Sequence, residues 1–384
     1  MLSPGDQAPS FDLSDQTGKR FFLQDAVGSP LLLLFHGSEA LEPNREILKA
    51  FESVWEEYQK AGIQVVSISP DSPSQRASFL ETHPLTFPTL SDPGYTVSQR
   101  FGIVEVDSLT GELDSPLSFT VVFLNQNLVI LDMYGPFAAE HIPALLQIVT
   151  THCPKQSPII VTDAYTPPVL LIPNVFDPAT CRDIIEVWET QGNQESHFMR
   201  SNGERTYGVV DHRIKIRRDH FIRDETIKNT INRIFQKRVY PEMKKCFQAE
   251  VFEYEHFKIA CYDAQTGGYF RPHRDNTSGG TSHRQWAMSL NLNSEEYEGG
   301  YLRFPEYGTQ LYKPDTGSAV IFSCSLMHEA TDVTQGKRFV LLSFFYGEKE
   351  SRSRQSYREK YGTADYVPKE VLESNTALKK EKDS

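Results

Sequence analysis

Residues 251–346 form a series of short β-prone runs separated by glycine-containing turns. This pattern is typical of an antiparallel sandwich or jelly roll, because each run is short and each turn reverses the chain. Two helical segments precede it. One starts at the Asp177-Pro178 cap, and the other runs from Asp224 towards Phe247 and would be bent or divided by Pro241. We therefore expect an α+β domain in which helices come before a double-stranded β-helix. The runs expected as strands are 257–262, 269–275, 286–293, 300–304, 319–323 and 338–346.

The segment Ala260–Asn276, within this series, carries a histidine and a carboxylate two residues apart. In a strand, His273 and Asp275 would project from the same face. His328 follows another apolar run far downstream. Two histidines and one carboxylate on a metal leave three adjacent positions open, the arrangement of non-haem Fe(II) oxygenases. These three residues are our candidate metal ligands and catalytic residues.

The first part of the chain alternates strand and helix signals instead. The run Leu31–Phe35 is apolar throughout and predicts a buried strand. Strands alternating with amphipathic helices indicate an α/β layered structure. The expected elements are strands at 31–35, 63–69, 119–123 and 128–133, and helices at 41–60, 73–81 and 138–150.

The two parts of the chain differ in net charge. Residues 1–150 hold 19 acidic and 7 basic side chains, a net charge of −12, which equals the net charge of all 384 residues. The remainder is therefore balanced, and the acidic first part is unsuited to nucleic acid. The basic segment 212–218 alternates with isoleucine, which indicates a strand with one charged face. We expect no nucleic-acid partner.

The features of secreted and membrane proteins are missing from the sequence. Residues 1–10 carry no basic region followed by an apolar stretch, so no signal peptide is expected. The longest aliphatic run, 31–35, is too short to span a bilayer. The five cysteines form no C-x-x-C pair, which fits free thiols in a reducing compartment. We expect a cytoplasmic protein without membrane contact.

Proline-rich breaks suggest where the modules meet. We expect a first module at 1–152, a linker at 153–168, a second module at 169–348 and a charged, partly disordered tail at 349–384.

The first module resembles the peroxiredoxin branch of the thioredoxin fold over residues 3–150. The matching pieces are P-G-D-Q-A-P-S-F-D-L at 4–13, the apolar strand and following helix, V-V-S-I-S-P-D-S and F-P-T-L-S-D at 87–92. That family attacks peroxide with a thiolate at a helix start. The equivalent position is Asn44, residues 1–152 contain no cysteine, and the family's arginine is replaced near Leu117. We expect a non-catalytic module for homodimerisation, docking or substrate presentation, with His36 as a structural residue.

The second module resembles the prolyl 4-hydroxylase-like family of Fe(II)/2-oxoglutarate dioxygenases over residues 165–348. The ordered set is A-C-Y, G-G-Y-F-R-P-H-R-D-N, Y-E-G-G-Y-L-R-F-P-E, the distal His328, and Arg338 ten residues later. The resemblance implies Fe(II), 2-oxoglutarate and O2, with ascorbate as a further cofactor. It makes His273, Asp275 and His328 the iron ligands, and it assigns Tyr262 a hydrogen bond to the cosubstrate.

The far carboxylate of 2-oxoglutarate needs a fixed cation inside the barrel. Arg338 suits this role because arginine stays charged when desolvated and can bind a carboxylate with two hydrogen bonds. It would share a strand face with Val340, Leu342 and Phe344, and Asn291 or Ser289 could assist it. His256 and His283 are interpreted as structural residues.

The leading hypothesis is a hydroxylase acting on a prolyl or peptidyl substrate, with succinate and CO2 as co-products. A free amino acid or a carrier-bound small molecule is the alternative substrate. The rival from another class is a non-catalytic scaffold with a silent iron site. Thiol-peroxidase activity is a third hypothesis, and the absence of cysteine from the first module contradicts it.

Overall fold

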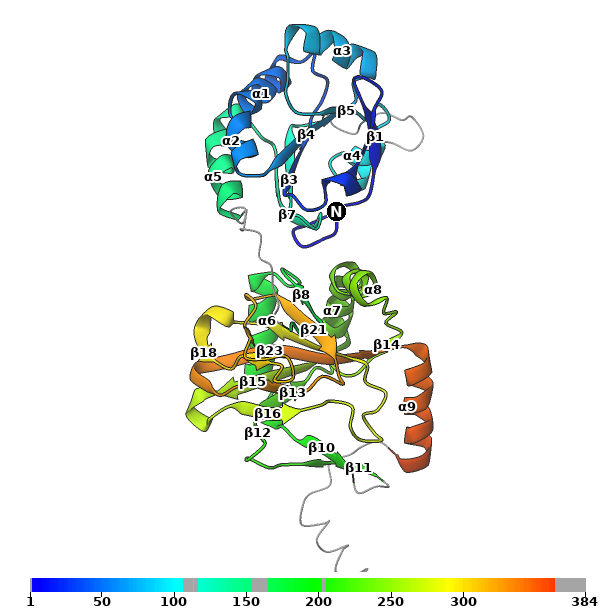
Figure 1. The fold of residues 1–384 in the computed structure, drawn as a ribbon, viewed down its shortest axis with the longest axis vertical. Coiled ribbons are helices and arrows are strands. Elements are labelled where there is room, and N and C mark those ends of the chain that lie inside the picture. The colour runs from blue at the N-terminus through cyan, green and yellow to red at the C-terminus, as the bar shows by residue number, and fades with distance from the viewer. Residues whose placement is uncertain (1, 106–112, 114–116, 153–164, 202–204, 363–384) are drawn as a thin grey trace, which may run out of the picture. The chain divides into compact units, whose positions relative to one another are not determined.

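The computed structural model describes residues 2–105, 113, 117–152, 165–201 and 205–362, and it divides into units 1–162 and 163–384 (Figure 1). The predicted linker at 153–168 lies mostly outside the described residues, as does the part of the predicted tail beyond residue 362. In the described part of the chain, no helix is both long and apolar enough to cross a membrane.

The first unit is built on one mixed sheet with the strand order β2-β1-β5-β4-β3-β6-β7. The central strand β3 is parallel to β4 and antiparallel to β6. All five of its residues are buried: Leu32 and Leu34 face one hydrophobic cluster, whereas Leu31, Leu33 and Phe35 face another. Both sheet faces are therefore covered, as in thioredoxin-like α/β folds. The strands are β1 Asp12–Asp15, β2 Arg20–Phe22, β3 Leu31–Phe35, β4 Gln64–Ser69, β5 Thr89–Ser91, β6 Thr120–Leu124 and β7 Ile130–Tyr134, and the helices are α1 Glu42–Ser53, α2 Trp55–Lys60, α3 Pro73–Thr82, α4 Thr96–Arg100 and α5 Ile142–His152.

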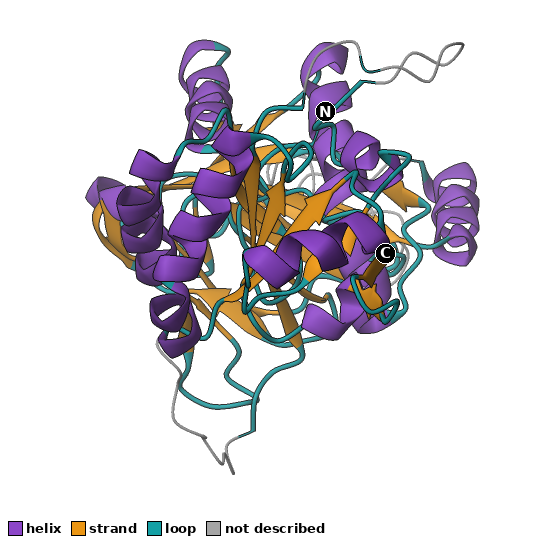
Figure 2. Cartoon of the chain, turned by 90° about the horizontal axis from the view of Figure 1, so that it is seen from above, coloured by secondary structure: helices purple, strands orange, loops and turns teal. Residues whose placement is uncertain are grey.

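The second unit packs helices against one of two antiparallel sheets, and Figure 2 distinguishes its helices from its strands by colour. The larger sheet has the order β8-β21-β17-β23-β15-β13-β9, with β14 and β18 paired to β23, and the smaller has the order β12-β16-β22-β19-β20. A separate ribbon joins β10 to β11. The elements are β8 Val169–Ile172, α6 Pro178–Thr190, β9 Gln194–Glu195, β10 Phe198–Ser201, β11 Thr206–Val209, β12 Lys215–Ile216, β13 Arg218–Phe221, α7 Glu225–Arg238, α8 Tyr240–Phe247, β14 Glu253–Tyr254, β15 Lys258–Asp263, β16 Tyr269–His273, β17 Trp286–Asn291, β18 Tyr297–Gly299, β19 Leu302–Arg303, β20 Leu311–Tyr312, β21 Ala319–Ser323, β22 His328–Ala330, β23 Val333–Tyr346 and α9 Glu348–Tyr361.

The alternation of β15 shows how the larger sheet separates its two faces. Ile259 and Cys261 belong to the main core with the helices α6, α7 and α8. Ala260 and Tyr262 belong to a cluster that also contains Ala330 of the smaller sheet. Because successive strand residues point to opposite faces, Lys258 shares the inner face with Ala260 and Tyr262. The inner space lies between the two sheets, as expected for a jelly roll.

Two expected segments differ from the structure by more than a shift of their ends. The helix predicted at 41–60 is divided at Val54, whose backbone has φ −115° and ψ 12°. The segment from Asp224 to Phe247 is divided, which was one of its two expected forms: Pro241 lies in the first turn of α8, where its missing N–H costs no hydrogen bond. Residues 349–361, expected in the charged, partly disordered tail, belong to helix α9.

Helix α9 is stabilised by contacts along the helix and with the rest of the second unit, which its highly charged sequence did not indicate. Arg352 and Glu348 form an ion pair one turn apart, which adds modest local support. Tyr357 accepts a hydrogen bond from the backbone of Thr206 at 2.9 Å, and Arg354 donates to the hydroxyl of Tyr346. These contacts attach α9 to the body of the second unit (Figure 1).

Candidate metal centre

Two histidines face each other across the smaller sheet. The strands β16 and β22 pair antiparallel, and their register sets His273 opposite His328. Directly opposed residues in such a pair have neighbouring side chains. Their ring centroids are 4.3 Å apart. Sheet pairing therefore brings together two residues that are far apart in the sequence.

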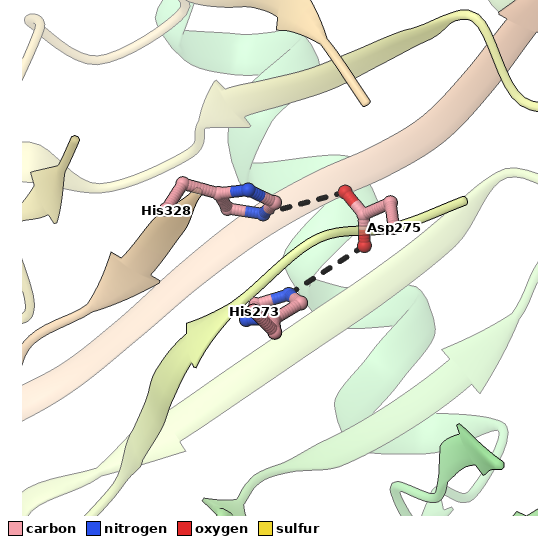
Figure 3. Close-up of side chains that lie close together, drawn as sticks. All are labelled: His273, Asp275 and His328. Carbon is pink, nitrogen blue, oxygen red and sulfur yellow. Dashed lines mark ion pairs between the residues drawn. The ribbon is translucent and has the colours of Figure 1, made fainter. Parts of the chain in front are cut away.

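Asp275 reaches the same point from just beyond the end of β16. The strand stops at His273, so the predicted strand to Asp275 is two residues too long. The backbone N–H of Asp275 donates to the carbonyl of Cys324 at 3.0 Å, which fixes the turn. One carboxylate oxygen lies 3.5 Å from His273 Nε2 and the other lies 3.3 Å from His328 Nε2 (Figure 3).

Each imidazole is oriented by its other nitrogen. His273 Nδ1 lies 2.8 Å from the carbonyl oxygen of Arg271, and His328 Nδ1 lies 3.0 Å from that of Leu326. A carbonyl oxygen only accepts, so both Nδ1 atoms carry the proton, and in the neutral rings both Nε2 atoms keep a lone pair. Backbone carbonyls commonly orient metal-binding histidines in this way.

The electrostatics of the cluster also favour a bound cation. Burial and the neighbouring His328 together lower the pKa of His273 to about 4. Burial opposes protonation of His328 too, but the carboxylate of Asp275 outweighs it and raises the pKa of that imidazole. Burial alone would raise the pKa of Asp275, yet the two imidazoles hold it well below its usual range.

Three lone-pair atoms thus converge around one point. The potential ligand atoms of His273, Asp275 and His328 all lie within 4.8 Å of one another. The donor set of two imidazoles and one carboxylate fits a divalent transition metal with open coordination positions.

Arg338 is the second predicted site residue, and it is a buried cation. It lies on β23, between β15 and β17, and is 4 % exposed. Its Nη2 lies 3.3 Å from Ser289 Oγ and 3.5 Å from Asn291 Oδ1, and its Nε has no hydrogen-bond partner. No carboxylate of a described residue lies within 4 Å of it. A buried guanidinium without an anion fits the carboxylate of a bound acid.

Tyr262 and Asn291 lie beside Arg338 with different partners. The Arg338 guanidinium lies 5.2 Å from the centre of the Tyr262 ring, and the Tyr262 hydroxyl accepts a hydrogen bond from Arg217 at 3.1 Å. Asn291 is held by its amide nitrogen, which lies 2.8 Å from the carbonyl of Pro314. Asn291 therefore contacts Arg338 from a fixed position, and its role towards a cosubstrate stays a prediction.

One cavity of about 730 Å³ includes the three converging residues, Tyr262 and Arg338 in its lining. This volume lies within the range of small-molecule sites, about 300–1,000 Å³. The cavity is large enough for a cosubstrate and a small second ligand.

Comparison with known proteins assigns each unit to a family. The model of the AhpC/TSA family matches residues 4–130, and that of the 2OG-Fe(II) oxygenase superfamily matches residues 257–346. The chain is 34 % identical over 112 residues to the peroxiredoxin Bcp of Escherichia coli, covering 29 % of this chain and 71 % of that protein. It is 30 % identical over 145 residues to a Mycobacterium tuberculosis protein named as a peroxiredoxin, covering 38 % of this chain and 92 % of the other.

The chain joins an AhpC/TSA redoxin domain to a 2OG-Fe(II) oxygenase domain. The crystal structure of the peroxidoxin BcpB of Mycobacterium tuberculosis overlaps the redoxin domain with a TM-score of 0.37 and 24 % identity, covering 40 % of this chain and 98 % of that one. Both predicted families and both predicted folds are confirmed. The protein is an enzyme of the 2-oxoglutarate-dependent dioxygenase class, for which the family implies Fe(II), 2-oxoglutarate and O2.

In the redoxin domain, Asn44 is the residue predicted to stand at the position of the family's nucleophile. Asn44 is 7 % exposed and donates from Nδ2 to the carbonyl of Ser38 at 3.0 Å. His36 is fully buried, with Nε2 2.9 Å from Ser67 Oγ and its ring stacked on Phe119. Burial lowers the pKa of His36 to about 3, so the ring is a neutral structural group.

In the oxygenase domain, several buried cations were missed by sequence reasoning. The segment 212–218 was interpreted as a strand with a charged face, but Lys215 and Arg217 are only 4 % and 6 % exposed. Lys258 and Arg284 also line the cavity. The alternation of charges was visible in the sequence. The sequence did not indicate that these side chains point inward, because a charged strand face usually points to water.

Proposed function

We propose that the oxygenase domain hydroxylates a C–H bond, with His273, Asp275 and His328 holding Fe(II). The supporting observation is the convergence of their ligand atoms, with both Nδ1 protons tied to backbone carbonyls. Bound Fe(II) supplies the chemistry that couples O2 to decarboxylation of 2-oxoglutarate. One C–H bond, O2 and 2-oxoglutarate give one alcohol, succinate and CO2. One oxygen atom enters the alcohol and the other enters succinate.

The roles of this chain's residues in the reaction are to bind and to orient. Arg338 would hold the far carboxylate of 2-oxoglutarate, with Ser289 and Asn291 fixing its guanidinium. Tyr262 would donate its hydroxyl proton to the cosubstrate, since that hydroxyl already accepts from Arg217. Burial of these groups keeps water from competing for the cosubstrate. Ascorbate is the further cofactor that the family resemblance implies.

A prolyl residue in a peptide is the substrate that the family resemblance favours. A free amino acid or a carrier-bound small molecule is the second candidate, and the cations that line the cavity favour it. For the redoxin domain we propose a non-catalytic role, with dimerisation as one form of it. An absence of peroxide consumption by the full chain is the expected result, and measurable turnover would contradict this role.

An anaerobic titration tests the iron assignment. Fe(II) added to the full chain with 2-oxoglutarate should produce a weak visible metal-to-ligand band. His328→Ala should abolish the band, whereas His256→Ala, which changes a histidine outside the proposed ligand set, should leave it intact. Absence of the band in the wild type, or its survival in His328→Ala, would refute the proposal.

A further inference from the structure

A second group of cations lies on the inner face of the oxygenase domain. Lys215 in β12, Arg217 between β12 and β13, and Asp219 and Phe221 in β13 all line the cavity. Lys258, on the neighbouring strand β15, projects towards them. Lys215, Arg217 and Asp219 are each less than 7 % exposed. Three cations are thus enclosed in one place.

A single carboxylate, that of Asp219, contacts two of these three side chains. Arg217 binds both oxygens of Asp219, from Nε at 2.7 Å and from Nη2 at 2.8 Å. Lys258 Nζ lies 3.5 Å from the same carboxylate. Within the described ranges, no carboxylate lies within 4 Å of Lys215, whose Nζ donates to the carbonyl of His197. The group therefore holds three basic side chains and one carboxylate.

An excess of basic side chains over carboxylates is unfavourable where the side chains are buried. Burial pulls the pKa of Lys215 well below its usual range, and the neighbouring Arg217 lowers it further. Buried charges are normally paired, because an unpaired ion loses its hydration without compensation. The wider cavity shows the same excess, since eight lysine or arginine side chains and four carboxylates line it. One of those carboxylates is Asp275, the proposed metal ligand.

This group lies close to the candidate metal centre and is separate from Arg338. Lys215 Nζ lies 4.6 Å from the centre of the Phe270 ring, and Phe270 stacks on His273 with 3.4 Å between the ring centroids. The guanidinium groups of Arg217 and Arg338 both lie near the Tyr262 ring, at 5.5 and 5.2 Å from its centre. The cavity therefore has two cationic positions that both adjoin Tyr262.

We propose that the hydroxylated substrate is a small molecule carrying a carboxylate, which binds Lys215 and Lys258 while Arg338 holds 2-oxoglutarate. This inference rests on the proposed hydroxylase function. A carboxylate bound to Lys215 would lie one aromatic ring, that of Phe270, away from His273. The enclosure of Lys215 requires the anionic group to enter the cavity. A free amino acid meets this requirement, whereas a neutral prolyl residue inside a peptide chain does not.

Matched acids and amides test the proposal. Isothermal titration calorimetry under nitrogen, on the full chain with Mn(II) and 2-oxoglutarate, would compare each of the twenty free L-amino acids with its primary amide. Acetyl-prolyl-amide serves as the peptide arm. At least one free acid should bind with a Kd at least tenfold lower than that of its amide. Equal binding of every acid and amide, or binding of the blocked peptide alone, would overturn the proposal.

Lysine variants test which residues hold the carboxylate. Lys215→Met and Lys258→Met should each reduce the preference for the acid at least tenfold. Lys244→Met, in an exposed lysine of α8, should leave it unchanged. A preference that survives both cavity variants would refute the assignment. If Lys215→Met fails to fold, the comparison of acid and amide in the wild type and in Lys258→Met still tests the proposal.

A separate measurement keeps the two proposals distinguishable. Wild-type protein with Fe(II), O2 and 2-oxoglutarate should form succinate slowly without any added substrate. If it forms none, the hydroxylase proposal fails. If it forms succinate but prefers no acid over its amide, only the carboxylate proposal fails.

Discussion

Arg338 offers the sharpest test among single residues, because it is a buried cation whose anion has to come from a ligand. Arg338→Met should weaken 2-oxoglutarate binding at least roughly tenfold, since each hydrogen bond to a charged group contributes about 1.5–3 kcal/mol. Arg338→Lys should give an intermediate Kd, because lysine keeps the charge but not the paired donors. Calorimetric titration of the Mn(II)-loaded chain measures this.

Its neighbour Lys337 is the matched control for that experiment. It is 51 % exposed and pairs with Asp263 at 3.6 Å. Lys337→Met should therefore bind 2-oxoglutarate like the wild type. Unaltered affinity in Arg338→Met would show that another cation holds the cosubstrate.

Glu255 allows a prediction about stability. Its carboxylate accepts from Arg284 Nε at 2.8 Å and from Arg284 Nη2 at 2.9 Å, and it lies 2.7 Å from His283 Nε2. Glu255→Gln should destabilise the oxygenase domain by about 3 kcal/mol at pH 7, because it leaves a buried guanidinium unpaired. Urea unfolding measures this, and Glu186→Gln, in an exposed residue of α6, should change little.

The same carboxylate sets the pH dependence of this effect. Burial alone would raise the pKa of Glu255, but Arg284 outweighs it and holds the pKa below the ordinary value of 4.5. A lowered pKa means that the stabilisation is present above the ordinary value and is lost as the pH falls below it. The difference between wild type and Glu255→Gln should therefore shrink at pH 4. A difference that stays constant from pH 7 to pH 4 would contradict the ion pair as its cause.

The spacing and the chemical type of the residues decided which site residues could be predicted from the sequence. His273, Asp275, His328 and Arg338 could be predicted because their order and their strand positions carry chemical meaning. Lys215 and Arg217 could not, because the direction in which a charged strand face points depends on which sheet covers it. That choice is made by tertiary pairing.

The helix α9 and the ribbon β10–β11 are linked elements beside the cavity. Tyr357 joins them by accepting from the Thr206 N–H, and Thr206 Oγ1 accepts in turn from the Gly280 N–H at 2.8 Å. Tyr357→Ala should loosen the ribbon, because it removes both the acceptor and the ring that packs on Gly279. Hydrogen exchange of the Thr206–Val209 amides should become faster, and Tyr357→Phe should have a smaller effect.

The control on the same helix is Gln355→Ala, in an exposed residue whose amide contacts only Glu359 among the described side chains. It should leave the exchange rates of β11 unchanged. Equal rates in Tyr357→Ala and wild type would mean that other contacts hold the ribbon. The sequence did not predict α9, because residues such as Arg354 and Tyr357 form too narrow a contact stripe to give an apolar periodicity.

At the scale of the whole molecule, each unit has its own hydrophobic core. The cores around β3 contain residues of the redoxin domain alone, and those around β15 and β23 contain residues of the oxygenase domain alone. The division could be predicted from the sequence because charge, periodicity and proline-rich breaks all change near the same point. The sequence could not predict how the core of the oxygenase domain is shared between two sheets, because this depends on which strands pair.

Separate cores lead to a prediction about unfolding of the full chain. Mn(II) and 2-oxoglutarate should bind the oxygenase domain alone, because its residues supply the proposed ligands. A ligand at 100 times its Kd stabilises the folded state by about 2.7 kcal/mol. For a domain of this size, that corresponds to a rise in Tm of roughly 5–10 °C. Scanning calorimetry should therefore show one transition whose Tm rises when the ligands are added and one whose Tm does not.

The variant His328→Ala is the control for this experiment. In it, the ligands should raise neither Tm as much as they raise the Tm of the oxygenase domain in the wild type. An equal rise of both transitions would contradict the assignment of the binding site to one domain, whereas no rise in either would count against the metal centre itself.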